Sequence, residues 1–315
     1  MAATPQTTTT TVSSDGSSSR TRVATPIKVK LNPVEETMLI TLWSRAHDAA
    51  TANPLLGDTY AQATLDRIDT SNLSSALFPR DQRYHNYASI RAREIDTRCR
   101  KFLETHADTP ITVLHLACGL DHRATRLRPW RGDKVTWIDL DRPEVVSLRR
   151  RLALPQDKVK EKEEDQKDPN YRLLGISVAD ANWAELVPSD RPLLVIAEGL
   201  FPYLTREDAT ALLKNLVDRA PSGMMVLDTV GTVLARFSAM MPMYRGTGVK
   251  LLGIDDGSEL AAAHPRLKLV DTARFHDLLP GPFASGAPPC LGTLTPLFSL
   301  LPSWRTYGQL FQFEF

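Results

Sequence analysis

Small and acidic residues follow four consecutive apolar segments of this sequence. They are Gly119 and Asp121 after the first segment, Asp139 and Asp141 after the second, Ser177 and Asp180 after the third, and Glu198 with Gly199 after the fourth. A single acid in such a place often only caps a following helix. If the four segments are parallel strands, however, their polar residues meet at one edge of a sheet, where ligands bind.

The residues after the first segment limit what this edge can bind. Gly119 allows a ligand to approach the backbone closely, but the G-x-G-x-x-G pattern of dinucleotide sites is missing, and Asp121 would repel a phosphate. An acid after the second strand suits ribose hydroxyls, and acids near the first and fourth suit an ammonium or an adenine amino group. S-adenosylmethionine combines these groups with a sulfonium and has no phosphate, so it is the predicted cofactor.

The elements that position these residues follow from the apolar periodicity. Predicted strands cover 113–116, 135–138, 173–176, 193–197, 224–227, 267–270 and 310–315, and helices between them cover 123–129, 143–153, 181–187 and 205–219. This alternation predicts an α/β fold with a mostly parallel sheet. We expect the last strand to be antiparallel.

The rest of the chain is divided into a tail, a helical lead and a late cap. Residues 1–26 are rich in Ser and Thr, which predicts disorder. A single domain is expected over 27–315, with helices over 32–105 that start at Asn32, at 58–69 and at 87–103, and the sheet core over 111–230. Residues 231–315 are expected to hold the last strands and a cap whose methionines and aromatics either shape the substrate pocket or form ordinary core.

Composition excludes several classes of protein. The 315 residues include 38 Lys and Arg against 37 Asp and Glu, so there is no basic nucleic-acid footprint. Three widely spaced cysteines fit neither a disulfide framework nor a zinc site. No apolar run approaches 18 residues. We predict a cytoplasmic protein that needs no metal, nucleic acid or membrane, and the oligomeric state is left open.

Three motifs resemble the leucine carboxyl methyltransferase family, and within it the polyketide O-methyltransferases of the tetracenomycin type. They are LACGLDHR at 116–123, WIDLDRPEV at 137–145 and AEGLFPYL at 197–204. The likeness begins in the helical lead and covers nearly everything except the tail. It implies a Rossmann-like class I methyltransferase sheet of seven strands that binds S-adenosylmethionine.

The resemblance also assigns residues to the cofactor. Arg91 matches the family arginine that pairs with the cofactor's carboxylate, a task that suits a guanidinium. Gly119 matches the glycine under the cofactor. Asp141 matches the ribose-binding acid, with Asp139 as the second choice, and Glu198 matches the acid beside the methionyl part.

The sequence departs from the family pattern at two places, and its catalytic candidates are few. Cys118 stands where the family often has Gly or Ala. Ser177 occupies the position of an adenine-contacting acid, which leaves Asp180 as a substitute. Tyr203, at the family spacing after Glu198, and His122, beside the glycine turn, are the candidate catalytic residues, although placement matters more than acid–base chemistry here.

Methyl transfer from a sulfonium requires chiefly that donor and acceptor be held close in a site with little water. A carboxylate acceptor is ionised near neutrality and needs no base, whereas a phenol would benefit from one. The leading hypothesis is therefore an O-methyltransferase of a small polyketide-like acid or phenol. The alternatives are a protein C-terminal carboxyl methyltransferase and a repurposed binder that has the fold without activity.

Overall fold

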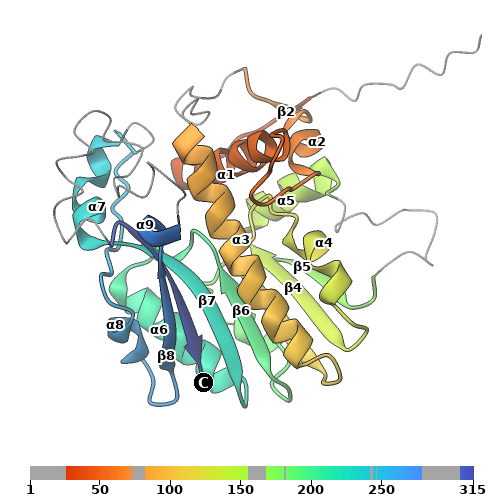
Figure 1. The fold of residues 1–315 in the computed structure, drawn as a ribbon, viewed down its shortest axis with the longest axis vertical. Coiled ribbons are helices and arrows are strands. Elements are labelled where there is room, and N and C mark those ends of the chain that lie inside the picture. The colour runs from red at the N-terminus through yellow and green to blue at the C-terminus, as the bar shows by residue number, and fades with distance from the viewer. Residues whose placement is uncertain are drawn as a thin grey trace, which may run out of the picture.

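The computed structural model describes residues 26–71, 73, 82–154, 168–180, 182–241, 244–245, 247–278 and 306–315. Its centre is a seven-stranded sheet of order β5-β4-β3-β6-β7-β9-β8 (Figure 1). The strands are β3 (Ile111–Leu116), β4 (Val135–Asp141), β5 (Tyr171–Gly175), β6 (Leu193–Ala197), β7 (Gly223–Val230), β8 (Lys268–Arg274) and β9 (Gly308–Glu314). Only β9 runs opposite to the other strands of this sheet. The predicted fold class is confirmed.

Helices cover both faces of the sheet because its strands are apolar on both sides. Helix α3 (Gln82–Thr105) crosses one face (Figure 1), where Val113 belongs to the same apolar cluster as Ile95. Helix α6 (Arg206–Arg219) packs on the other face, in the cluster that contains Leu114. Successive residues of β3 therefore point to opposite layers, as the pleat of a strand requires.

Helix α1 (Pro33–Ala49) begins where the sequence predicts, at a capping box. The Asn32 side chain accepts a hydrogen bond from the Glu35 amide at 2.9 Å, and the Glu35 carboxylate accepts one from the Asn32 amide at 3.0 Å. Pro33 occupies the first helical turn, where its missing N–H costs nothing. Helix α1 lies across the top of the molecule in Figure 1, above the carboxyl ends of the parallel strands.

The prediction of one helix over 58–69 is wrong. Helix α2 covers only Ala61–Leu65, and Ile68–Asp69 form strand β2, which pairs in parallel with β1 (Ile27–Lys28). Long-range pairing overrides the local helical pattern here, because Ile68 becomes buried and the Ile27 amide donates to the Arg67 carbonyl at 2.7 Å.

Two other predicted helices are shorter than expected, and two are confirmed. The segment 123–129 divides into α4 (Arg123–Arg126) and a 3₁₀ helix that contains Pro129, since proline removes a helical donor. Of the segment 181–187 the structure describes residues 182–187, which contain a 3₁₀ helix at Trp183–Leu186 and no α-helix. Helices α5 (Pro143–Leu152) and α6 agree with the prediction.

In the described part of the late segment, two short α-helices precede β8 and a third follows it. They are α7 (Thr232–Phe237), α8 (Ser258–Ala261) and α9 (Phe275–Leu278). The predicted disordered tail, except for Pro26, and the proline-rich stretch 280–289 lie outside the described residues. No helix in the described ranges is long and apolar enough to span a membrane. Those ranges likewise contain no group of three His, Cys, Asp or Glu residues arranged to hold a metal ion.

Candidate functional site

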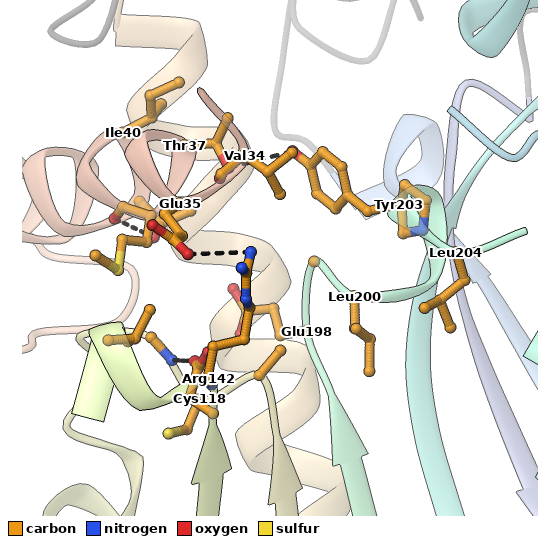
Figure 2. Close-up of a pocket in the computed structure, with 18 of the residues that line it drawn as sticks. Val34, Glu35, Thr37, Ile40, Cys118, Arg142, Glu198, Leu200, Tyr203 and Leu204 are labelled. Carbon is orange, nitrogen blue, oxygen red and sulfur yellow. Dashed lines mark hydrogen bonds and ion pairs between the residues drawn. The ribbon is translucent and has the colours of Figure 1, made fainter. Parts of the chain in front are cut away.

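A cavity of about 930 Å³ lies at the carboxyl ends of the parallel strands, beneath α1 (Figure 2). The strand order reverses between β3 and β6, which is where open α/β sheets bind their ligands. The cavity is near the upper end of the range for ligand pockets, roughly 300–1,000 Å³. It therefore has room for a cofactor and a second small molecule. All four predicted strand ends contribute to its lining, through Gly119, Asp121, Asp141, Ser177, Asp180, Glu198 and Gly199.

Asp141 ties the glycine turn to the end of β4. One of its carboxylate oxygens accepts a hydrogen bond from the Gly119 amide at 2.7 Å, and the other accepts one from the Arg142 amide at 2.7 Å. Gly119 has a φ of +50°, a conformation that a residue with a Cβ rarely adopts. Burial raises the pKa of Asp141 although the two amides oppose the rise. Each oxygen retains a lone pair for a ligand hydroxyl.

Asp139 does not reach the cavity, so its assignment as a cofactor ligand is wrong. It lies one pleat deeper in β4 than Asp141, and both of its oxygens already have partners. One accepts from the Trp137 indole at 2.7 Å, and the other accepts from Arg149 and from the Tyr171 hydroxyl, each at 2.8 Å. Asp139 therefore holds the sheet together beneath the site.

Cys118 is a buried packing residue at the floor of the cavity. Its side chain is 2% exposed, and the Arg149 guanidinium donates to its Sγ at 2.6 Å and to the Gly119 carbonyl at 3.2 Å. The small thiol therefore lets Arg149 support the glycine turn from below. This arrangement explains why the departure from Gly or Ala is tolerated.

Arg91 lies between two carboxylates, Glu198 after β6 and Asp228 in β7. Its Nε donates to Glu198 Oε1 at 3.1 Å, and its Nη1 donates to Asp228 Oδ2 at 2.8 Å. The other Asp228 oxygen accepts from the Gly199 amide at 2.6 Å. Sequence reasoning missed Asp228 although it directly follows the predicted strand 224–227. The rule used for the first four strands, an acid after an apolar run, would have found it if it had been applied to the fifth.

A second arginine holds Glu198 from the other side. Arg123 is fully buried and donates to Glu198 Oε2 at 2.6 Å and to Asp96 Oδ1 at 2.6 Å. It also lies 3.1 Å from Asp121, whose other oxygen accepts from Arg126 at 2.7 Å. Burial alone would raise the pKa of Asp121, but the surrounding arginines hold it well below its usual range. Asp121 thus lines the cavity as a charge fixed by arginines.

Ser177 and Asp180 form a closed turn after β5 at the edge of the cavity. Asp180 accepts a hydrogen bond from the Ser177 amide at 3.1 Å, and Ser177 Oγ accepts one from the Ala179 amide at 3.2 Å. Ile176 and Val178 line the cavity beside them. The turn thus offers an apolar surface next to polar groups, which suits a flat heterocycle.

The two catalytic candidates differ sharply in position. His122 is fully buried and does not line the cavity, because its ring bonds Asp58 at 3.0 Å and Thr64 at 2.9 Å. The hypothesis that His122 is catalytic is therefore wrong. Tyr203 does line the cavity, and Figure 2 shows it extending toward Thr37 of α1. Tyr244, from the late segment, contacts the same hydroxyl at 2.8 Å.

The two arginines around Glu198 predict a specific acid sensitivity. Burial would raise the pKa of Glu198, but Arg91 and Arg123 outweigh it and lower the pKa to about 2. A carboxylate whose pKa is lower in the folded state stabilises that state at pH values above its pKa in the unfolded chain, near 4.3. This contribution is lost as the pH falls toward 2. Between these pH values the wild-type protein should therefore take up about one more proton on unfolding than Glu198→Gln.

Urea unfolding at a series of acidic pH values measures this difference, because proton uptake is the slope of the unfolding free energy against pH. The exposed Glu207→Gln substitution in α6 is the matched control and should leave the slope unchanged. Equal slopes for the wild type and Glu198→Gln would contradict the described pairing with Arg91 and Arg123.

The sheet order, the antiparallel β9 and the glycine turn at the switch point define the class I fold of S-adenosylmethionine-dependent methyltransferases. The model of the leucine carboxyl methyltransferase family matches residues 38–217. The chain belongs to this family and is an S-adenosylmethionine-dependent methyltransferase. The predicted family and cofactor are therefore confirmed.

Two proteins of related sequence and one solved structure are similar to this chain. It is 34% identical to the tetracenomycin polyketide synthesis O-methyltransferase TcmP of Streptomyces glaucescens, over 91% of this chain and 98% of the relative. It is 36% identical to the S-adenosyl-L-methionine-dependent methyltransferase dpfgK of Gibberella zeae, over 76% and 82%. A DUF574 family protein from Streptomyces avermitilis shares the fold with a TM-score of 0.51 at 12% identity, over 87% and 95% of the two chains.

Proposed function

We propose that the protein is an O-methyltransferase that transfers the methyl group of S-adenosylmethionine to a carboxylate or phenol oxygen of a small, polyketide-like molecule. The observation that carries this proposal is the composition of the cavity. A charged end with Arg91, Glu198 and Asp141 continues into an end lined by tyrosines and apolar side chains. The likeness to an O-methyltransferase of tetracenomycin polyketide synthesis supports a role in secondary metabolism.

The charged end fits the cofactor group by group. The Arg91 guanidinium suits its carboxylate, and Glu198 suits its ammonium. Asp141 keeps lone pairs for the ribose hydroxyls. A Cβ added to Gly199 would meet no atom within 4 Å, so this turn leaves open space beside Glu198. The turn at Ser177 and its apolar neighbours would suit the adenine.

The rest of the cavity lining suits an apolar acceptor. Its lining includes Leu234, Met241, Val249, Leu251, Tyr87, Tyr203, Tyr244 and Tyr307. Aromatic rings and a thioether pack well against a planar molecule, while the hydroxyls can orient it. The part of this lining that comes from the late segment supports the predicted substrate cap.

The bound cofactor supplies a methyl group on a positively charged sulfur. The chain's own task is to align this methyl with the acceptor oxygen and to exclude water. His115 is the only histidine among the described lining residues, and it already contacts Asp139 at 3.2 Å and Arg123 at 3.1 Å. It is therefore poorly placed to take a proton, which favours an acceptor that is already ionised, such as a carboxylate.

Incubation of the protein with methyl-labelled S-adenosylmethionine and an extract of the organism that makes it tests the proposal. We expect label in the fraction that partitions into organic solvent, and a mass increase of one methyl group on a compound in it. Label in the protein fraction would instead support a protein carboxyl methyltransferase. If calorimetry detects no binding of S-adenosylhomocysteine, the chain is a repurposed protein and the proposal fails.

A further inference from the structure

Three hydroxyl groups form a chain that crosses the cavity from α1 to the late segment. Thr37 Oγ1 donates a hydrogen bond to the Val34 carbonyl at 2.6 Å. The Tyr203 hydroxyl donates to Thr37 Oγ1 at 3.2 Å, and the hydroxyls of Tyr203 and Tyr244 lie 2.8 Å apart. Figure 2 shows the contact between Thr37 and Tyr203 as a dashed line. This chain of hydrogen bonds therefore begins at the Val34 carbonyl, which can only accept.

Counting protons fixes the direction of every bond in this chain. Each hydroxyl has one proton to donate. The Thr37 proton is used on the Val34 carbonyl, and the Tyr203 proton is used on Thr37. In the remaining contact Tyr244 must therefore be the donor. Its oxygen is left with lone pairs and no proton to offer.

The Tyr244 oxygen is an acceptor that needs a donor. The side chain lines the cavity and is only 9% exposed. In the part of the chain that the structure describes, its hydroxyl has no hydrogen-bond partner other than Tyr203. Burial raises the pKa of Tyr244, and so does Tyr203, so the group stays neutral. A buried oxygen of this kind favours a ligand that brings an O–H group to it.

We propose that Tyr244 determines specificity by accepting a hydrogen bond from a free hydroxyl of the acceptor substrate. This inference rests on the proposed function and narrows its substrate class to hydroxylated aromatic acids. A neutral phenol oxygen is far too weak a base to take the substrate's proton. The recognised hydroxyl therefore keeps its proton and is not the oxygen that receives the methyl group, and the product retains it.

Ring-hydroxylated naphthoic and anthraquinone carboxylic acids are the probes, each compared with its methoxy and unsubstituted counterparts. The wild-type enzyme should prefer the hydroxylated compound by about tenfold in kcat/KM, the size expected of one buried hydrogen bond. Tyr244→Phe should abolish this preference while it leaves the binding of S-adenosylhomocysteine unchanged. A role in packing alone would instead lower the turnover of all three compounds equally, which would overturn the proposal.

Thr37→Val provides a second test because valine has the shape of threonine without the hydroxyl. The Tyr203 proton then loses its acceptor and turns to the Tyr244 oxygen, so Tyr244 must direct its own proton into the cavity. The methoxy compound should gain turnover, and the tenfold preference should fall to about twofold or less. An unchanged preference in Thr37→Val would overturn the assigned direction of the chain.

The outcomes separate this inference from the proposed function. If none of the probes is methylated but label from S-adenosylmethionine enters another small molecule of the extract, the substrate class is wrong while the proposed function stands. If the protein binds no S-adenosylhomocysteine, both fail. Methylation of the probes without preference for the hydroxyl overturns the role of Tyr244 alone.

Discussion

Arg91→Met is expected to weaken the binding of S-adenosylhomocysteine by about 100-fold, because truncating a buried charge partner costs several kcal/mol. The substitution removes the guanidinium that suits the ligand's carboxylate. It also leaves Glu198 and Asp228 buried side by side without the cation that separates them. Calorimetric titration measures the loss of affinity, and circular dichroism verifies that the variant is folded.

Arg93→Met is the matched control on the same helix. The Arg93 side chain is 41% exposed and contacts Glu94 at 3.4 Å, so its loss should change affinity by about twofold or less. Equal affinity of the wild type and Arg91→Met would show that the ligand's carboxylate binds elsewhere. Equal weakening in both variants would point to a general effect of charge on the helix.

Arg123→Met is expected to lower the free energy of unfolding by about 3–5 kcal/mol, the cost of breaking a buried ion pair by removing one partner. Arg123 is fully buried and its guanidinium contacts carboxylates of Asp96, Asp121 and Glu198. Methionine fills much of the same volume, so the lost charge rather than a cavity dominates the effect. Urea unfolding followed by circular dichroism measures the change.

Arg128→Met tests whether the effect is specific to burial. Arg128 lies on the exposed 3₁₀ helix that follows α4, and its replacement should change the unfolding free energy by no more than about 0.5 kcal/mol. A change below about 1 kcal/mol for Arg123→Met would contradict the view that this arginine balances the three acids.

The seven strands of the large sheet could be predicted because each contains a short apolar run between polar turns. The short strands β1 and β2 could not, because only their pairing with each other makes them strands. The glycine turn and the acids after the strands could be predicted as well, since strand ends in an α/β sheet share one edge. Gly119, Asp141, Ser177, Asp180 and Glu198 do meet around one cavity. Their roles toward the cofactor remain predictions that the experiments above test.

The sequence alone could not distinguish Asp139 from Asp141, because both follow the same apolar run two residues apart. Only the register of β4 decides that Asp139 lies one pleat deeper, where Trp137 and Arg149 take its oxygens. His122 failed as a candidate for a similar reason. His122 lies close to Gly119 in the sequence, but this closeness does not reveal Asp58 and Thr64, which form hydrogen bonds with its ring in the folded protein.

Local patterns in the chain were enough to predict the class of fold, the cofactor and the edge of the sheet proposed to bind it, because these depend on periodicity and on residue types at strand ends. The packed fold was needed to show which carboxylates remain open to a ligand and which are fixed by arginines. It also brings Thr37, Tyr203 and Tyr244 together from three distant segments. Hydrogen-bond direction and burial depend on such long-range neighbours, which no local pattern specifies.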